Sequence, residues 1–227
     1  MISGIIYGLA AALAASLLPG LFWLWYFRRY DIRDREPPAR LAQCLIYGAL
    51  AVAPALAWEA PFRELLQSSP PISVQFALSF LVVGLGEESC KLLAVCLAVW
   101  RAEEFSEPMD GILYAIAGGI GFSVVENILY ISAFGLAAAP LRGTVAALAH
   151  IAFSGLAGYF LGQARFGTQP VLTTAKGLGT AAAAHGLYDF LLLSQVVPPW
   201  TVVLLVAGLQ GLLFAAIGRA LQVPFRR

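Results

Sequence analysis

Charged residues are scarce in this chain of 227 residues, and their scarcity excludes an ordinary soluble domain. Lysine, arginine, aspartate and glutamate make up 12% of the sequence, about half of the share that is usual in soluble proteins. Hydrophobic residues make up 60%, against roughly 45–50% in soluble domains. The formal net charge of +1 gives no electrostatic basis for a nucleic-acid partner. The composition therefore predicts an integral membrane protein surrounded by the lipid bilayer.

Several catalytic and ligand-binding signatures are also missing. The three cysteines, Cys44, Cys90 and Cys96, form no CxxC pair, so they predict neither a disulfide framework nor a zinc–thiolate site. The HExxH pattern of zincins and the GxSxG pattern of serine hydrolases are both absent. One aspartate, Asp189, falls within an apolar stretch. A mechanism that needs two aspartates inside the membrane is therefore excluded.

Long apolar stretches dominate what is present. A membrane-spanning helix needs about 20 apolar residues, and the sequence offers seven such stretches. They predict an all-α, polytopic transmembrane bundle that forms a single integral-membrane domain over residues 1–227. The first stretch is longer than the roughly 7–15-residue core of a signal peptide, so we expect it to be retained. The expected spans are near residues 2–27, 41–58, 73–100, 111–134, 143–164, 177–195 and 200–219.

The basic residues outside these spans predict the orientation of the bundle. Cytoplasmic loops of membrane proteins carry an excess of lysine and arginine. With the N-terminus outside and the C-terminus inside, the outer loops carry two basic residues, Arg63 and Arg142. The inner segments then carry eleven, which are Arg28, Arg29, Arg33, Arg35, Arg40, Arg101, Arg165, Lys176, Arg219, Arg226 and Arg227. We therefore predict an N-out, C-in topology.

Ionisable side chains inside the apolar stretches are the most informative residues. An ionised group at the centre of a bilayer costs several kcal/mol, so such groups usually face a protein interior or a water-filled cavity and have a function there. At about 1.5 Å per residue, these groups lie roughly 12–24 Å from the predicted inner ends of their spans. They therefore share one slab of the membrane. The residues are Glu87, Glu88, Lys91, Glu126, His150, His185 and Asp189.

Two adjacent glutamates and a lysine form the first local pattern, EExxK. On a helix Lys91 is four residues after Glu87 and three after Glu88, so it can reach either carboxylate. The two glutamates point about 100° apart, so one can pair with Lys91 while the other faces a cavity. Two close carboxylates in a low dielectric do not both ionise cheaply, which gives a site an acid and a base. The alternative is a buried ion pair that only fixes helix packing.

The second pattern, FxxxE, places Phe122 and Glu126 on one helix face, one turn apart. An aromatic ring beside a carboxyl group excludes water from it. Asn127 follows directly and can donate a hydrogen bond. The alternative is an isolated polar residue that bonds across a helix interface.

The third pattern, HxxxD, places His185 and Asp189 one helical turn apart. A carboxylate that accepts a hydrogen bond from one imidazole nitrogen fixes the tautomer and increases the basicity of the other nitrogen. His185 is then suited to act as a general base, an oxyanion donor or a metal ligand. His150 stands alone in its span and serves either the site or a hydrogen bond between helices.

The three patterns together resemble the PrsW family of bacterial intramembrane proteases, which is related to the CAAX-prenyl endopeptidases. The family pattern is EExxK, FxxxE and HxxxD, in that order. Here it is GEESCK at 86–91, GFSVVEN at 121–127 and HGLYD at 185–189. The EPPAR stretch after the first span also resembles the family's inner loop. The CAAX-type relatives typically carry EExxxR and FxxxH, so Lys91 and Glu126 favour the PrsW branch.

The resemblance implies a glutamic-type peptidase in the bacterial cytoplasmic membrane. Its substrate would be a membrane-anchored, single-span protein, typically an anti-sigma factor, cut near the outer face. In this interpretation Glu87 or Glu88 deprotonates water, and His185, oriented by Asp189, stabilises the oxyanion or passes a proton to the leaving amine. Lys91 decides which glutamate stays charged. The expected catalytic residues are Glu87, Glu88, Glu126, His150, His185 and Asp189, supported by Lys91, Phe122 and Asn127.

Other interpretations of the same residues stay open. We expect no cofactor, but a zinc-dependent form of the same protease, with histidine and glutamate ligands, is not excluded, and the family has been described both as metallo- and as glutamic-type. Buried glutamate, histidine and aspartate are also the parts of proton relays, which favours a proton- or cation-coupled transporter as the second function. A third interpretation is a scaffold whose polar residues only hold helices together.

Overall fold

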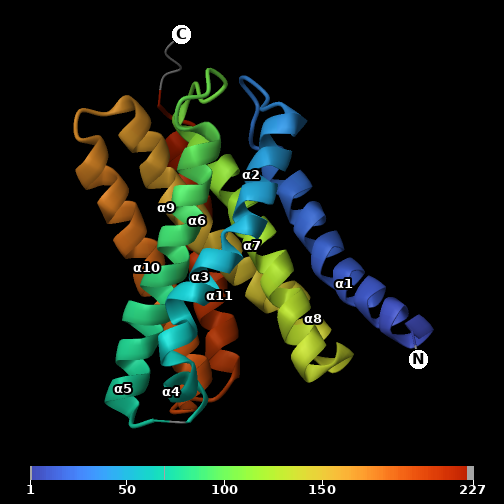
Figure 1. Ribbon diagram of the computed structural model, residues 1–227. Coiled ribbons are helices and arrows are strands. Elements are labelled where there is room, and N and C mark those ends of the chain that lie inside the picture. Colours follow the sequence, from blue (N-terminus) through green and yellow to red (C-terminus); the bar gives the residue numbers. More distant parts are fainter. Residues whose placement is uncertain (1, 69, 224–227) are drawn as a thin grey trace.

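The computed structural model describes residues 2–68 and 70–223, and these residues form a helical bundle without strands (Figure 1). This confirms the predicted all-α class. Seven long helical stretches, several of them assembled from shorter pieces, make up the described part of the chain. They are α1 (Ile2–Arg28); α2 (Pro38–Leu50) with α3 (Val52–Glu59), η1 (Ala60–Phe62) and α4 (Arg63–Gln67); α5 (Ile72–Ala77) with η2 (Leu78–Gly84) and α6 (Leu85–Val99); α7 (Pro108–Phe134); η3 (Leu136–Ala138) with α8 (Ala139–Leu141), η4 (Arg142–Ala146) and α9 (Ala147–Phe166); α10 (Pro170–Ser194); and α11 (Trp200–Ala220).

Five of these stretches are long and apolar enough to cross a membrane by length and composition. The stretch that contains α6 and the helix α10, which carry five of the seven ionisable residues, are not among the five. The number of spans and the N-out orientation therefore stay predictions. Met1, Arg226 and Arg227, which enter the orientation argument, lie outside the described residues. The five stretches are Ala10–Arg28, Pro38–Gln67, Pro108–Phe134, Leu136–Phe166 and Trp200–Ala220.

The second span extends further than the sequence predicts. We expected it over residues 41–58, but the helical stretch continues to Gln67 and is interrupted at Ala51. Pro54 explains the interruption, because proline has no N–H to donate to the carbonyl group of Leu50 and its ring crowds that turn. The expected end at residue 58 was therefore wrong, and the extension brings Glu59 and α4 into the bundle.

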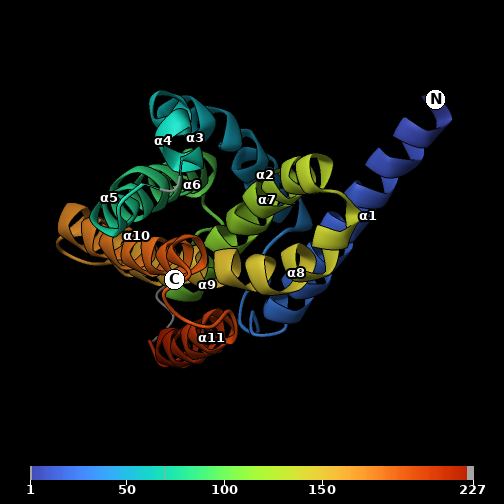
Figure 2. The same ribbon diagram turned by 90° about the horizontal axis from the view of Figure 1, so that it is seen from below.

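Helix α7 forms the centre of the bundle and packs against α9, α2 and α1 (Figures 1 and 2). Small residues allow the backbones to approach closely. A Cβ atom added at Gly158 of α9 would collide with the carbonyl oxygen of Gly111 in α7, and one at Gly121 would collide with the carbonyl oxygen of Leu45 in α2. The small residues at 121 and 158 therefore allow close packing of α7 against α2 and α9.

The helices connect alternately at two opposite ends of the bundle (Figure 1). Residues 29–37, 100–107 and 167–169 form the connections at one end, and this is the end that the basic residues predict as cytoplasmic. The second and third helical stretches, the fourth and fifth, and the sixth and seventh connect at the opposite end, which is predicted to face outward (Figure 1). Helix α10 packs on α9 and on the η2–α6 stretch, so the three sequence patterns lie on neighbouring helices.

Candidate active site

The first half of the site lies on α6, directly after the π-helical segment η2. π-helical turns are frequent at functional sites because they interrupt regular helix geometry. The indole N–H of Trp58 in α3 donates to the carbonyl oxygen of Val82 in η2 at 3.0 Å and thereby ties this turn to the neighbouring helix. The turn places both glutamates of α6 in the interior, where Glu87 is 6% exposed and Glu88 is 1% exposed.

Lys91 is the central cation of the site. Its Nζ lies 3.0 Å from Glu87 Oε2, 2.8 Å from Glu88 Oε1 and 3.0 Å from His150 Nδ1. One positive charge is thus shared between two buried carboxylates. The ring of Phe122 lies 4.1 Å from the same Nζ and closes the remaining side of the ammonium group with an aromatic face.

The two glutamates face different surroundings. Glu87 lines a cavity of about 630 Å³. Glu88 is not part of the described lining of that cavity and borders a void of about 10 Å³ instead. Its Oε1 contacts both Lys91 Nζ and, at 2.9 Å, His185 Nδ1. Glu87 is therefore placed to meet a substrate or a water molecule, and Glu88 is placed to hold the two basic groups.

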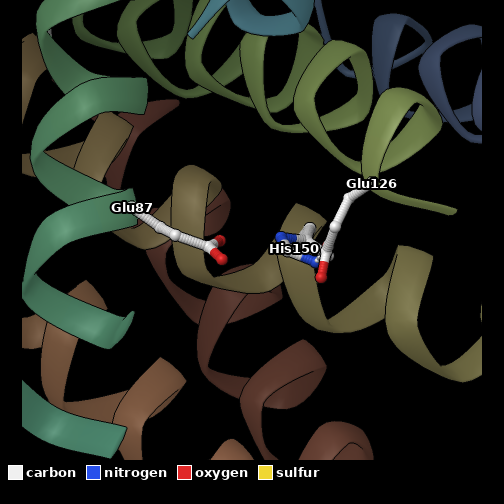
Figure 3. A group of neighbouring side chains, drawn as sticks. All are labelled: Glu87, Glu126 and His150. Carbon is white, nitrogen blue, oxygen red and sulfur yellow. Dashed lines mark ion pairs between the residues drawn. The ribbon is translucent and has the colours of Figure 1, made fainter. Parts of the chain in front are cut away.

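The second half of the site faces α6 from α7 and α9. Glu126 Oε2 lies 2.7 Å from His150 Nε2, and Glu126 Oε1 lies 2.9 Å from Arg142 Nη2. Figure 3 shows Glu126 of α7 next to His150 of α9, with Glu87 pointing toward them from α6. Asn127 supports this side, because its Oδ1 accepts a hydrogen bond from Arg142 Nε at 2.8 Å.

Helix α10 contributes the histidine–aspartate pair. His185 Nε2 lies 3.3 Å from Asp189 Oδ2 and 3.8 Å from Glu87 Oε2, and its Nδ1 faces Glu88. The ring of Phe153 stacks on the imidazole with 4.7 Å between centroids. The orientation of His185 is thus fixed by three carboxylates and one aromatic ring, and its ring lies 5.4 Å from that of His150.

The cavity connects this cluster to one end of the bundle. Glu87, Glu126 and Asp189 line it at the cluster, and the side chains of Glu126 and Asp189 are 17% and 19% exposed. Its lining continues to Leu66 of α4 and Phe134, the last residue of α7. Both lie at the end that the basic residues predict to face outward, so the cavity extends from the cluster toward this end.

Donor atoms for a metal ion are present in the same place. Glu87, Glu126 and His150 each offer one ligand atom, and these atoms lie within 4.8 Å of one another. Glu126 Oε2 and Asp189 Oδ2 are buried and form no aligned hydrogen bond with any described residue. Carboxylates and imidazole are the donor set of catalytic zinc sites. By donor chemistry, these residues therefore fit a zinc ion.

Sequence reasoning missed two residues of this site. We counted Arg142 as an outer-loop charge, but its side chain lies in the cavity wall against Glu126 and over the ring of Tyr130 at 3.9 Å. Arg142 is the one lysine or arginine between Arg101 and Arg165, and this isolation in the sequence could have indicated a role in the site. Glu59 also lines the cavity. It was missed because the expected second span ended before it.

A membrane protein in which buried carboxylates line a cavity and contact buried histidines has the features of an intramembrane hydrolase. The model of a family described as PrsW family intramembrane metalloprotease matches residues 36–217. The chain therefore belongs to the PrsW family of intramembrane proteases, which confirms the predicted family and the predicted enzyme class.

Curated relatives agree with this assignment. The chain is 31% identical to Protease PrsW of Geobacillus kaustophilus over 185 residues, which cover 81% of this chain and 80% of the relative. It is 30% identical to Protease PrsW of Bacillus subtilis over 80% of this chain and 83% of the relative. The match to Protease PrsW of Oceanobacillus iheyensis, also 30% identical, covers 88% of this chain and 94% of the relative. No solved structure matches the chain.

Proposed function

We propose that the protein hydrolyses a peptide bond of a membrane-anchored, single-span protein near the outer face of the bacterial cytoplasmic membrane. The observation that carries the proposal is the position of Glu87, Glu126 and Asp189 on a cavity of about 630 Å³ that extends toward the predicted outer end. Such a cavity is large enough for a short extended segment. By its family resemblance, the substrate is an anti-sigma-factor-like protein.

Glu87 is the proposed general base. It lines the cavity, whereas Glu88 contacts both Lys91 and His185 away from it. A water molecule that enters the cavity would donate a hydrogen bond to Glu87 and lose its proton as it attacks the carbonyl carbon. Lys91 keeps Glu87 in place through the contact with Oε2. A positioned base of this kind contributes about 10²–10⁴-fold to rate.

The groups opposite Glu87 are proposed to handle the developing charge and the leaving group. Arg142, held by Asn127, is a fixed cation at the cavity wall and can stabilise the oxyanion. His185 is fixed by Glu88 and Asp189 and can pass a proton to the leaving amine. Glu126 and His150 complete the site between these two groups.

The same residues define a zinc-dependent form of this protease. Glu87, Glu126 and His150 would hold the ion, because their donor atoms lie within 4.8 Å of one another. A bound zinc ion supplies a Lewis acid that activates water and polarises a carbonyl group. Glu88 and His185 then keep the roles described above, since neither belongs to this donor set.

The test uses the purified protein in lipid vesicles with a synthetic single-span substrate, and the products are read by mass spectrometry. The proposal predicts one defined cut in the outer half of the substrate span, which His185→Ala abolishes. Absence of a cut by the wild-type protein with a panel of such substrates, or an unchanged cut by His185→Ala, would contradict it. Elemental analysis and chelation decide between the two forms. Stoichiometric zinc, with activity lost on chelation and restored by zinc alone, indicates the metal-dependent one.

A further inference from the structure

A second buried polar cluster lies at the other end of the bundle, away from the cavity. It contains four carboxyl groups, none of which belongs to the three sequence patterns. Asp31 and Glu36 come from the connection between α1 and α2, and Glu107 and Asp110 come from the beginning of α7. Each of the four residues is only 1% exposed.

Three of these residues converge on one point. Asp31, Glu107 and Asp110 each place a carboxylate oxygen within 4.8 Å of those of the other two. The protein uses one oxygen of each residue. Asp31 Oδ2 accepts from the backbone N–H of Glu36 at 2.7 Å, Asp110 Oδ2 accepts from that of Glu107 at 2.7 Å, and Glu107 Oε2 lies 3.2 Å from Arg33 Nη1.

The second oxygen of each carboxyl group accepts no N–H hydrogen bond among the described residues, and the neighbour of the Asp110 carboxyl group is the carboxyl group of Glu36. The second oxygens are Asp31 Oδ1, Glu107 Oε1 and Asp110 Oδ1, and all three are fully buried. A buried acceptor without a hydrogen bond costs about 1–3 kcal/mol, and more when it is charged. Three such atoms in one cluster therefore indicate that a ligand for carboxylate oxygens binds here.

The charges of the cluster are also unmatched. Arg33 pairs with Glu107, and Arg28 donates from Nη2 to the carbonyl oxygen of Glu36 at 2.9 Å. Among the described residues, Arg33 therefore forms the one ion pair with a carboxyl group of this cluster, because Arg28 reaches a backbone carbonyl group. Burial raises the pKa of Asp31 and of Glu107, because water no longer stabilises their charged forms.

We propose that Asp31, Glu107 and Asp110 bind one divalent cation of the kind that prefers oxygen ligands, Mg²⁺ or Ca²⁺. A donor set made only of carboxylates suits these ions, whereas the mixed set of carboxylates and imidazole at the active site suits zinc. The ion would tie the connection between α1 and α2 to the beginning of α7, the helix that carries Glu126.

The experiment measures thermal unfolding of the purified full-length protein in detergent, first with a chelator and then with added Mg²⁺ or Ca²⁺. Asp31→Asn and Asp110→Asn each remove one negative charge and keep an oxygen that accepts the existing backbone hydrogen bond. Asp34→Asn is the matched control, because Asp34 lies in the same connection and is exposed. Glu87→Gln is a second control, because it removes one donor of the candidate zinc site and leaves the acidic cluster unchanged.

We expect at least one of the two ions to raise the unfolding temperature of the wild-type protein by several degrees. The rise should persist in Asp34→Asn and in Glu87→Gln, and it should disappear in Asp31→Asn and Asp110→Asn. With chelator present, both asparagine variants should unfold at or above the wild-type temperature, because they lose a repulsive charge. Should Asp31→Asn fail to fold, Asp110→Asn and a count of bound Mn²⁺ by electron paramagnetic resonance take its place.

Three results would overturn the proposal. The first is a wild-type protein whose unfolding temperature responds to neither ion, which would mean that protons neutralise the cluster. The second is a rise that survives in a folded Asp31→Asn or Asp110→Asn variant. The third is a rise that disappears in Glu87→Gln, which would assign the ion to the active site. None of these results depends on proteolytic activity, so they test the cation site independently of the proposed function.

Discussion

The cluster around Lys91 and the acidic cluster beside Arg33 are both buried, but they differ in charge balance and in surroundings. At the first, Glu87, Glu88, Glu126 and Asp189 each lie within 4 Å of a lysine, an arginine or a histidine, and all but Glu88 line a cavity. At the second, the pair of Arg33 with Glu107 is the one ion pair of a carboxylate among the described residues. The comparison teaches that burial alone does not define a catalytic site. Matched charges beside an accessible cavity suit chemistry, and unmatched charges in a closed cluster suit an ion.

The difference in charge balance is tested most strongly by removing one carboxylate from each cluster. Glu88→Gln leaves Lys91 and His185 with a weaker partner, so we expect the free energy of unfolding to fall by about 1–3 kcal/mol. The free energy of unfolding of the Asp31→Asn variant, measured in the presence of chelator, should not be lower than that of the wild type. Denaturant unfolding in detergent checks both, with the exposed Glu64→Gln as a control. A Glu88→Gln variant as stable as the wild type would remove the distinction between the clusters.

Close packing of α10 against η2 gives the next prediction. A Cβ atom at Gly186 would lie 2.7 Å from the Cα atom of Phe80, so Gly186→Ala must push the two helices apart. His185 is the adjacent residue, and a displacement of about 1 Å can reduce the rate about 10²-fold. We expect cleavage to fall by about that factor.

Gly179→Ala is the matched control on the same helix, because an added Cβ there meets nothing within 4 Å. It should keep both stability and cleavage. Equal cleavage by the two alanine variants would show that the spacing between α10 and η2 does not position His185.

A smaller effect is expected from the residue that holds Arg142. Asn127→Ala removes the acceptor of Arg142 Nε, and a lost hydrogen bond of about 0.5–1.5 kcal/mol corresponds to a loss of roughly 2–10-fold. The loss should fall on kcat, with little change in KM, because Arg142 is proposed to act in the transition state. Ser123→Ala is the control, since its hydroxyl contacts Asn127 and not Arg142. A change confined to KM would instead assign Arg142 to substrate binding.

The orientation of the two clusters in the membrane is tested without any loss of function. Reporter fusions at residues 35, 105 and 170 should be cytoplasmic, and fusions at 66 and 139 should be outside. The acidic cluster would then face the cytoplasm, and the cavity would extend outward. An outside signal at 35 or 170 would invert the bundle and direct the cavity toward the cytoplasm.

The cluster around Lys91 was largely predictable from the sequence because its residues form local patterns inside apolar stretches. Glu87, Glu88 and Lys91 lie within two turns of one helix, and His185 and Asp189 lie one turn apart. The cost of such groups in lipid explains why they converge in the structure. The sequence does not reveal that Glu87 rather than Glu88 lines the cavity. This depends on the direction in which α6 presents its side chains after the π-helical segment η2.

The acidic cluster was not predictable in the same way. Asp31 and Glu36 lie in one polar connection, and Glu107 lies in another, where carboxylates are ordinary and usually exposed. Only the packing of α1 and α2 against α7 brings them together. The helix ends were predicted to within a few residues except at three places. The second span continues past Pro54 to Gln67, and the fifth and sixth helical stretches begin at Leu136 and Pro170 instead of residues 143 and 177. Arg142 was misplaced because a charge next to a predicted loop was assumed to be exposed.

The most direct test of the account compares Glu87→Gln with Glu64→Gln in the cleavage assay, with substrate binding and unfolding temperature measured for both. The account predicts that Glu87→Gln folds and binds substrate but loses about 10²–10⁴-fold in kcat, while Glu64→Gln cleaves like the wild type. A folded Glu87→Gln variant that cleaves at the wild-type rate would contradict the central claim that Glu87 activates the attacking water.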